Sequence, residues 1–228
     1  MRIAVVGGMG AVAQQLVVQA MEAGHFVSWM VKPTDQLPDP CLETDYTQVL
    51  CIVRSSWDDT VKYDELVSEC DAVIVALDFN HTRPEQFVPV QRVVQKSMAR
   101  HNVQRIILVT THGSAESSRQ LDWELWAKLN VNQVFYMALG TMAPCWSIIS
   151  QYTAQEQVVK SAESLKYTIL RPAAVTDGPT TGTYLASPSH IFGGYISAAD
   201  VADCALKALD HDMDVSQAFS IAYSSRVA

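Results

Sequence analysis

The first thirteen residues place an apolar run directly before a cluster of glycines, and this junction limits the possible folds more than any other feature of the chain. Residues 3–6 are typical of a buried strand, and Gly7, Gly8 and Gly10 follow at once. In a strand-turn-helix unit, Gly7 permits a tight turn, Gly10 lets the backbone approach a pyrophosphate, and the small Ala13 lets the helix pack against the strand. The free helix N-terminus then holds the anion through its N–H groups. The pattern predicts a dinucleotide site, with a glycine-rich turn that binds nothing as the alternative.

Strand-like and helical segments alternate along the rest of the chain, which favours parallel strands joined by helices. Strands are predicted at residues 2–6, 26–31, 49–54, 72–77, 105–111, 167–170 and 218–222. Helices are predicted at residues 11–23, 60–69, 84–101, 150–164 and 198–210. The expected fold class is α/β: a Rossmann-like, doubly wound parallel sheet with helices on both faces and a small region that covers the substrate.

The length of 228 residues suits one domain, and we expect residues 1–228 to form a single NAD(P)-binding Rossmann domain. Residues 113–146 fit the alternation least well, and we interpret them as an insertion. This insertion and the 176–196 loop are expected to cover the active site. The alternative is that the aromatic residues of the insertion pack a pair of surface helices.

Composition and charge exclude several classes of partner. Apolar residues make up 49% of the chain, but no run of eighteen apolar residues occurs, so no membrane span is expected. A net charge of −8 disfavours general nucleic-acid binding, so any anion site must be built locally. The scattered cysteines form no C-x-x-C pair and no signal peptide is recognised, which together predict a cytoplasmic protein with reduced thiols. The histidines lack the spacing of metal ligands, and no metal site is expected.

The end of the second predicted strand favours one form of the cofactor. A carboxylate there would bind the ribose hydroxyls and repel a phosphate, whereas Lys32 offers a cation. We therefore expect NADP(H), with NAD(H) bound at lower affinity, because lysine is a point charge and not a bidentate fork. Arg54, at the end of the third strand, is a second candidate for the 2′-phosphate. The alternative is that Lys32 is an ordinary solvated residue.

Several segments carry a resemblance to a known superfamily. They are residues 5–13 (VVGGMGAVA), 31–32 (VK), 71–76 (DAVIVA), 109–111 (VTT), 165–172 (LKYTILRP) and 176–179 (TDGP). Together they resemble the atypical short-chain dehydrogenases/reductases, and within them the NmrA-like NAD(P)-binding branch that includes biliverdin-IXβ reductase, also called flavin reductase. The resemblance covers nearly the whole chain and leaves out only residues 113–146.

The resemblance implies where each part of the cofactor lies. The residues that would wrap the pyrophosphate are Gly7, Met9, Gly10, Ala11 and Val12. The residues implied beside the rest of the cofactor are Ala76, Leu77, Asp78, Thr110, Pro172, Ala173 and Ala174, the last three through backbone contacts with the nicotinamide. Lys32 would stand where the family places an arginine on the 2′-phosphate. Thr111 would take the position of an active-site serine.

Two departures from the family pattern bear on the cofactor site. Ser56 stands where an aspartate near the adenine is common, so we expect the adenine contact to pass to Trp57, whose ring can stack on it. Asp78 replaces a glycine that allows close approach to the cofactor. It is expected either to narrow the site or to contribute chemistry.

A third departure concerns proton transfer. Short-chain dehydrogenases that act on alcohols use a Tyr-x-x-x-Lys pair, and the chain has none; Tyr152, for example, is followed by Glu156. Alcohol–ketone interconversion is thus disfavoured, and we expect a planar conjugated acceptor that can take its proton from water. His112 and Tyr152 are candidate catalytic residues beside Thr111, with a structural role for the histidine as the alternative.

The sequence therefore predicts an NADPH-dependent reductase that transfers hydride to a flavin, a tetrapyrrole or a quinone. The first alternative is a redox sensor or scaffold that binds NADP(H) without turnover, and the second is a non-redox isomerase or lyase. The expected partner is a small aromatic or conjugated molecule. The chain is expected to act as a monomer or a homodimer.

Overall fold

The apolar runs of the sequence form the strands of one large sheet in the computed structural model, which describes residues 1–38, 49–120, 143–188, 194–210 and 215–224. The strands are β1 (Arg2–Val6), β2 (Phe26–Val31), β3 (Leu50–Arg54), β4 (Ala72–Val75), β5 (Arg105–Val109), β6 (Lys166–Pro172), β7 (Ala174–Thr176), β8 (Leu185–Ser187), β9 (Tyr195–Ser197) and β10 (Gln217–Ala222). The helices are α1 (Ala11–Glu22), α2 (Thr60–Val67), α3 (Phe87–Arg100), α6 (Ala143–Lys160) and α7 (Ala198–Asp210), with short 3-10 turns η3 (Pro84–Gln86) and η4 (Ala115–Gln120).

The sheet has eight strands in the order β3-β2-β1-β4-β5-β6-β10-β8, and every pairing is parallel except that of β8 with β10. The strand order reverses direction between β1 and β4, because the chain first builds outward to β3 and then returns to the other side of β1. Doubly wound sheets bind ligands beyond the carboxyl ends of the strands at this switch point. The expected α/β class with a doubly wound sheet is confirmed.

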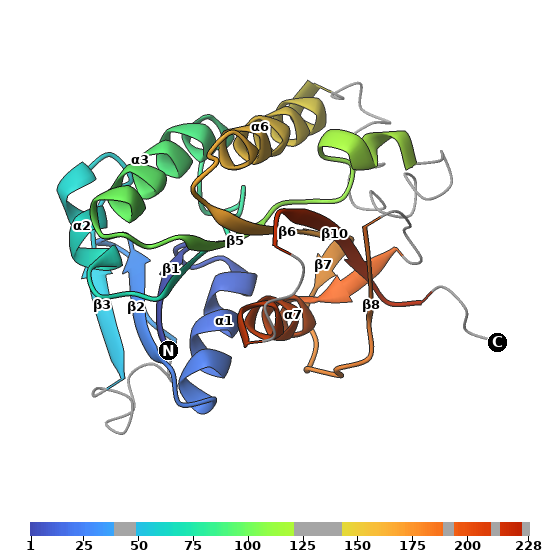
Figure 1. Cartoon of the computed structure of the whole chain (residues 1–228). Helices are drawn as coiled ribbons and strands as arrows, with labels where there is room; N and C mark the ends of the chain where they lie inside the picture. The colour runs from blue at the N-terminus through green and yellow to red at the C-terminus, as the bar shows by residue number, and fades with distance from the viewer. Residues whose placement is uncertain (39–48, 121–142, 189–193, 211–214, 225–228) are drawn as a thin grey trace.

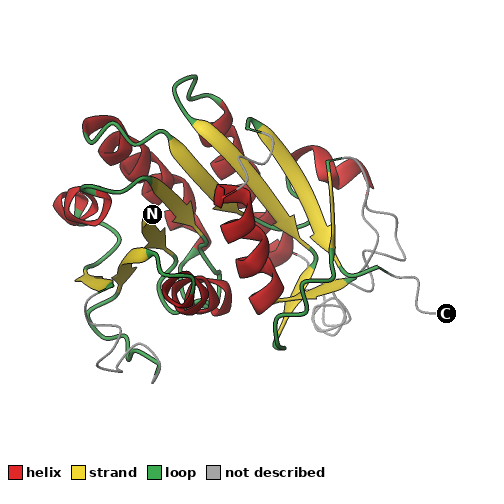
Figure 2. Cartoon of the chain, turned by 60° about the horizontal axis from the view of Figure 1, so that its bottom comes forward, coloured by secondary structure: helices red, strands yellow, loops and turns green. Residues whose placement is uncertain are grey.

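Side chains alternate between two helix layers along each strand. In β1, Ile3 and Val5 belong to the core beneath α1 and α7, whereas Ala4 and Val6 belong to the core beneath α2, α3 and α6. Figure 1 shows α2, α3 and α6 above the sheet and α1 and α7 below it. Figure 2, in which the bottom of that view comes forward, shows the strands side by side with helices in front and behind. Burial on both faces explains why the strands read as continuous apolar runs.

The boundaries differ from the expected ones where the sequence signal is weak. α6 begins at Ala143, seven residues before the predicted start at residue 150, because Pro144 is tolerated in the first turn of a helix. The strands β7, β8 and β9 were not predicted, since three residues are too few to show a period. β8 and the first two residues of β9 fall within the 176–196 segment, where a covering loop was expected.

The proposed insertion at residues 113–146 is described only at its two ends, by η4 and by the start of α6. Residues 121–142 and 189–193 lie outside the described residues, so a role for either segment in covering the active site stays a prediction. Among the described residues, no helix combines the length and the apolar character needed to cross a membrane. The same residues include no cluster of three or more potential metal ligands.

Candidate cofactor and active site

The glycine turn between β1 and α1 has no room for side chains. A methyl group on Gly7 would lie 2.6 Å from both the Ala13 Cβ atom and the Ala76 carbonyl oxygen. Gly8 adopts a φ of +55°, a left-handed conformation that other residues rarely take. The small residues at positions 7, 13 and 76 therefore let α1 pack directly against the ends of β1 and β4.

The N-terminus of α1 is open to an anion. Its N-cap is Gly10, no described side chain caps the helix, and the first turn contains no acidic residue. The amide of Gln14 donates to the Met9 carbonyl over 2.7 Å, and the indole of Trp29 donates to the Gly8 carbonyl over 3.2 Å. These two contacts hold the turn in place and leave the helix amides to face a ligand. The residues present thus fit a diphosphate, as the sequence predicts.

Two cations gather at the ends of β2 and β3. The strand register pairs Val31 with Arg54, which brings Arg54 next to the backbone of Lys32. The Arg54 guanidinium donates to the carbonyls of Lys32, Pro33 and Asp35. The Lys32 ammonium donates to the carbonyl of His81, from the loop after β4. Both predicted phosphate candidates therefore lie on one side of the glycine turn, and the loop after β4 reaches them.

A carboxylate shares this corner. The Asp35 Oδ2 atom accepts the Lys32 backbone N–H over 2.8 Å and would lie 3.9 Å from a methyl group on Gly8. Sequence reasoning missed Asp35, because it stands three residues beyond Lys32 and outside any strand. A carboxylate at this place opposes the binding of a 2′-phosphate.

Trp57 also lies against the glycine turn. Its Cζ2 atom would be 3.3 Å from a methyl group on Gly8, and only 5% of the residue is exposed. The indole Nε1 atom is buried and has no hydrogen-bond partner among the described residues. The neighbouring Ser56 is exposed. The expected adenine contact of Trp57 stays a prediction.

Asp78 faces the start of α1. A methyl group on Gly10 would lie 2.9 Å from the Asp78 Cβ atom and 3.5 Å from its Oδ2 atom. The carboxylate accepts the Asn80 backbone N–H over 2.8 Å and lies 3.2 Å from the His81 Nδ1 atom. Asp78 therefore crowds the turn and places a negative charge beside the expected diphosphate. The preceding Ala76 and Leu77 are buried at the end of β4.

The predicted nicotinamide residues meet at the ends of β5 and β6. The Thr110 N–H donates to the Leu170 carbonyl, and the His112 N–H donates to the Pro172 carbonyl, each over 2.9 Å. The Ala173 N–H then donates to the Ile221 carbonyl of β10, and the Ala174 N–H donates to the carbonyl of residue 194. Thr111 is half-buried between Thr110 and His112. The structure thus brings the β5 and β6 members of the predicted set side by side.

A buried charged network lies beneath this edge. The Glu156 carboxylate, which is fully buried, accepts hydrogen bonds from the Thr110 hydroxyl over 2.9 Å and the Ser114 hydroxyl over 2.6 Å. The Arg171 guanidinium donates to both Glu156 oxygens, over 3.0 and 2.5 Å. The Glu156 carboxylate of α6 therefore links the segment that follows β5 to strand β6 through hydrogen bonds. Buried charges are stable when they are paired and fully hydrogen-bonded in this way.

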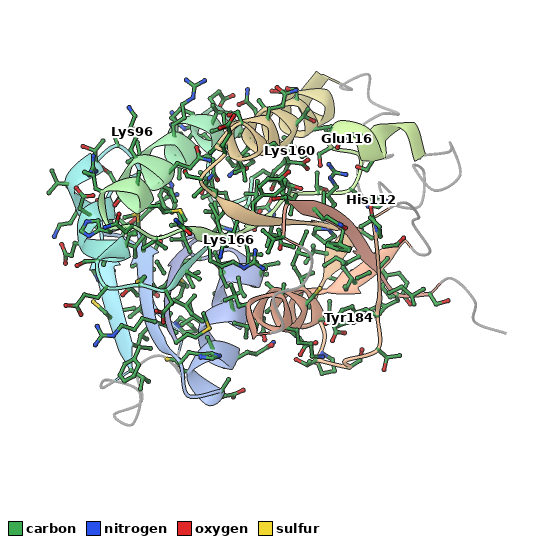
Figure 3. The ribbon with its side chains drawn as sticks, viewed as in Figure 1. Lys96, His112, Glu116, Lys160, Lys166 and Tyr184 are labelled. Carbon is green, nitrogen blue, oxygen red and sulfur yellow. The ribbon has the colours of Figure 1, made fainter. Side chains whose placement is uncertain are left out.

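Glu116 of η4 closes the network at the surface. It bonds Arg171 over 2.6 Å and Lys160 over 2.9 Å, and Figure 3 shows Glu116 and Lys160 facing one another across η4 and α6. Burial alone would raise the pKa of Glu116, but the hydrogen bonds from Lys160 and Arg171 outweigh burial and lower that pKa to about 2. Burial would likewise lower the pKa of Arg171, but the hydrogen bonds and charges of Glu156 and Glu116 raise it.

Sequence reasoning missed this network, although it noticed two of its members. Glu156 stands out in the sequence only as the residue four positions after Tyr152 that is not a lysine, just as Arg171 follows Tyr167. A signal was present in the helical pair Glu156 and Lys160, whose i,i+4 spacing places both on one face of α6.

Tyr152 lies in the core beneath α3. Its hydroxyl donates to the Leu77 carbonyl over 2.9 Å, and its ring centroid lies 4.8 Å from that of Phe87. Burial and the charge of Asp78 raise the pKa of Tyr152. This geometry gives Tyr152 a role in fixing the end of β4, and its catalytic role stays a prediction.

His112 is buried beside β6, with 5% of the residue exposed. Its Nδ1 atom lies 3.4 Å from the Arg171 carbonyl, and its Nε2 atom has no partner among the described residues. Burial lowers the pKa of His112 to about 4, and the nearby Arg171 charge acts in the same direction. The imidazole is therefore neutral at pH 7, which makes it a hydrogen-bonding group and not a strong acid.

With this geometry described, the chain can be compared with known proteins. A family model described as NAD(P)H-binding matches residues 7–212, which is most of the chain. The chain belongs to the NAD(P)H-binding family. The match begins at Gly7, the first glycine of the turn, and no curated protein sequence matches the chain.

Solved structures share the fold of this NAD(P)H-binding chain. ChuY, an anaerobillin reductase from Escherichia coli O157:H7, is 18% identical with a TM-score of 0.75, and the match covers 100% of this chain and 99% of ChuY. A short-chain dehydrogenase/reductase from Veillonella parvula in complex with NADP is 16% identical with a TM-score of 0.76, covering 98% and 95% of the two chains. An oxidoreductase from Lactococcus lactis is 16% identical with a TM-score of 0.72, covering 100% and 93%. The family model confirms the expected NAD(P)-binding family, and these structures share the fold of the chain.

The position of Asp78 generates a prediction about cofactor affinity. Asp78→Asn keeps the size of the side chain and removes the charge that faces the N-terminus of α1. We expect NADPH to bind about tenfold more tightly at low salt, with a smaller gain at high salt, because the removed repulsion is screened. Fluorescence titration with NADPH at two salt concentrations measures this. The matched control is Glu163→Gln, an exposed residue at the opposite end of β6, which should leave affinity unchanged. Unchanged or weaker binding by Asp78→Asn would contradict the expected position of the diphosphate.

Proposed function

We propose that this protein is an NADPH-dependent reductase that transfers hydride to a planar conjugated acceptor of the flavin, tetrapyrrole or quinone type. The observation that carries the proposal is that Glu156 stands on α6 four residues after Tyr152, and that its carboxylate bonds Thr110 and Arg171 at the edge formed by β5 and β6. An alcohol dehydrogenase of this superfamily needs a lysine at that spacing to lower the tyrosine pKa. Here a carboxylate stands in its place, and burial raises the tyrosine pKa.

This chemistry suits an acceptor that needs no strong acid. A bound nicotinamide would supply the hydride, and a conjugated acceptor spreads the resulting charge and takes its proton from water. The protein then has to orient the two rings and restrict the surrounding water. The backbone at Thr111 and Pro172 forms the edge on which such a stack would rest, and Glu156 and Arg171 hold that edge rigid. A neighbour named a reductase also supports this class of reaction.

Selectivity for NADP(H) is the second part of the proposal. Lys32 and Arg54 stand together at the corner where a 2′-phosphate would lie, and the Lys32 ammonium and the Arg54 guanidinium are both candidates to bind it. Asp35 opposes them with one negative charge. We therefore expect a preference for NADP(H) that is real but moderate, with NAD(H) bound at lower affinity.

The competing function with support from this chain is that of an NADP(H)-binding sensor or scaffold. The absence of a Tyr-x-x-x-Lys pair is equally consistent with a protein that binds the cofactor and transforms nothing. A non-redox isomerase or lyase on the same fold stays a weaker alternative. The cytoplasmic location and the monomeric or homodimeric state also stay predictions.

Turnover separates these functions. Purified protein mixed with NADPH and an acceptor should show loss of absorbance at the reduced-nicotinamide band with FMN, biliverdin or menadione. Omission of the protein is the control for direct reduction of the acceptor. Tight NADPH binding without turnover on any of the three acceptors would contradict the reductase and favour the sensor.

Exchange of Lys32 tests the cofactor preference. Lys32→Ala should weaken NADPH binding at least about tenfold more than NADH binding, because a charge-assisted hydrogen bond to a phosphate is lost only with NADPH. Dissociation constants for both nucleotides measure the difference. Lys96→Ala removes an exposed lysine of α3, which lies beside the segments that precede β5 and β6, and should change neither constant. Equal losses for the two cofactors would refute a contact between Lys32 and the 2′-phosphate.

A further inference from the structure

His112 has a fixed tautomer. Its Nδ1 atom faces the carbonyl oxygen of Arg171 at 3.4 Å, and a carbonyl can only accept a hydrogen bond. Nδ1 must therefore carry the ring proton. In a neutral imidazole the other nitrogen, Nε2, then has a free lone pair and can only accept.

The groups around His112 keep the ring neutral. The Arg171 guanidinium, on the neighbouring strand β6, is a cation that opposes protonation of the ring, and burial acts in the same direction. Glu156 of α6 and Glu116 of η4 are the carboxylates on the elements packed here, and both are already paired with Arg171. Neither carboxylate is a hydrogen-bond partner of the imidazole among the described residues.

The Nε2 atom is a buried acceptor without a donor. His112 is only 5% exposed, and no described residue reaches Nε2. Buried polar atoms in folded proteins almost always have a partner, so an exception beside a functional edge points to a ligand. His112 lies at that edge, because its backbone N–H bonds the carbonyl of Pro172, the residue expected to support the nicotinamide. In Figure 3 it lies near the junction of η4 with the ends of β6 and β10.

We infer that the Nε2 atom of His112 accepts a hydrogen bond from a ring N–H group of the electron acceptor, and that this contact selects acceptors carrying such a group. The inference rests on the proposed function and narrows its substrate class. Oxidised flavins carry one ring N–H, and linear tetrapyrroles carry several. Simple quinones carry none, so they leave Nε2 unpartnered and are poorer ligands. His112 is thus a specificity-determining residue and not the proton donor.

The test compares two ligands that differ in one N–H group. Lumiflavin has a free N3–H, and N3-methyllumiflavin has a methyl group there. With saturating NADP⁺ present, flavin fluorescence gives the dissociation constant of each without turnover. We expect the protein to bind lumiflavin about tenfold more tightly than its N3-methyl form, the size expected when a buried acceptor loses its donor.

Two variants separate the Nε2 contact from the packing of the ring. His112→Asn can still donate to the Arg171 carbonyl but has no atom at the Nε2 position, so it should bind both flavins alike. His112→Gln places an amide oxygen near that position and should keep part of the preference for lumiflavin. Both variants should retain NADP⁺ affinity, and circular dichroism reports whether each is folded. The affinity of menadione, which has no N–H, should be the same in His112→Asn as in the unaltered protein.

The outcomes are distinguishable from failure of the proposed function. Equal affinity of the unaltered protein for the two flavins overturns the inference, as does failure to bind either one. An equal loss of lumiflavin and menadione binding in His112→Asn also overturns it, because it assigns His112 a structural role. If His112→Asn does not fold, the ratio in the unaltered protein and in His112→Gln decides. Selective flavin binding without NADPH oxidation would uphold the contact and refute the reductase.

Discussion

The direct packing of α1 on the ends of β1 and β4 is the constraint on which the rest of the site depends. Gly7 makes it possible, because a single methyl group there would meet Ala13 and the Ala76 carbonyl at 2.6 Å. Backbone atoms cannot move aside as a flexible side chain can, so overpacking at this point would cost roughly 1–3 kcal/mol or more. The close approach brings the uncapped N-terminus of α1 to the switch point of the sheet. That position determines the roles proposed for Lys32, Trp57, Asp78 and the end of β5.

The second organising element is the ion pair of Glu156 and Arg171. Glu156 stands on α6 four residues after Tyr152, the spacing at which short-chain dehydrogenases of alcohols carry a lysine. Glu156 fixes Thr110 and Ser114 after β5, and Arg171 fixes the same carboxylate from β6. In the proposed function, Glu156 holds the backbone at this edge in place, and the protein orients the reactants without a tyrosine tuned for acid–base chemistry. A neutral, buried His112 is consistent with that shift.

The sequence predicts the parts of this protein whose signals are local. The long strands and α1, α2, α3 and α7 follow from apolar runs and helical periodicity, and the glycine turn follows from residue size. β7, β8 and β9 have only three residues each and pair with strands distant in the chain, so no local sequence pattern predicts them. The boundary of α6 was missed because Pro144 looks like an end and is in fact part of the first turn.

The candidate site divides in the same way. The residues of the turn and of β5 and β6 that are proposed to bind the cofactor follow from the motifs, and the structure brings the β5 and β6 members side by side. Glu116 and the pairing of Glu156 with Arg171 could not, since both act through contacts between elements that the sequence separates. Asp35 could not either, because it lies outside any strand and no pattern marks it. The neutral state of His112 also depends on its burial and on the nearby Arg171 charge, and the order of residues shows neither of these.

The central claim is that the first loop holds a dinucleotide diphosphate on the backbone amides at the start of α1. Isothermal titration calorimetry of the protein with NADPH tests this claim most directly. The account predicts saturable binding of one nucleotide per chain, with an affinity that falls as salt is added. Absence of saturable heat with either NADPH or NADH would contradict it.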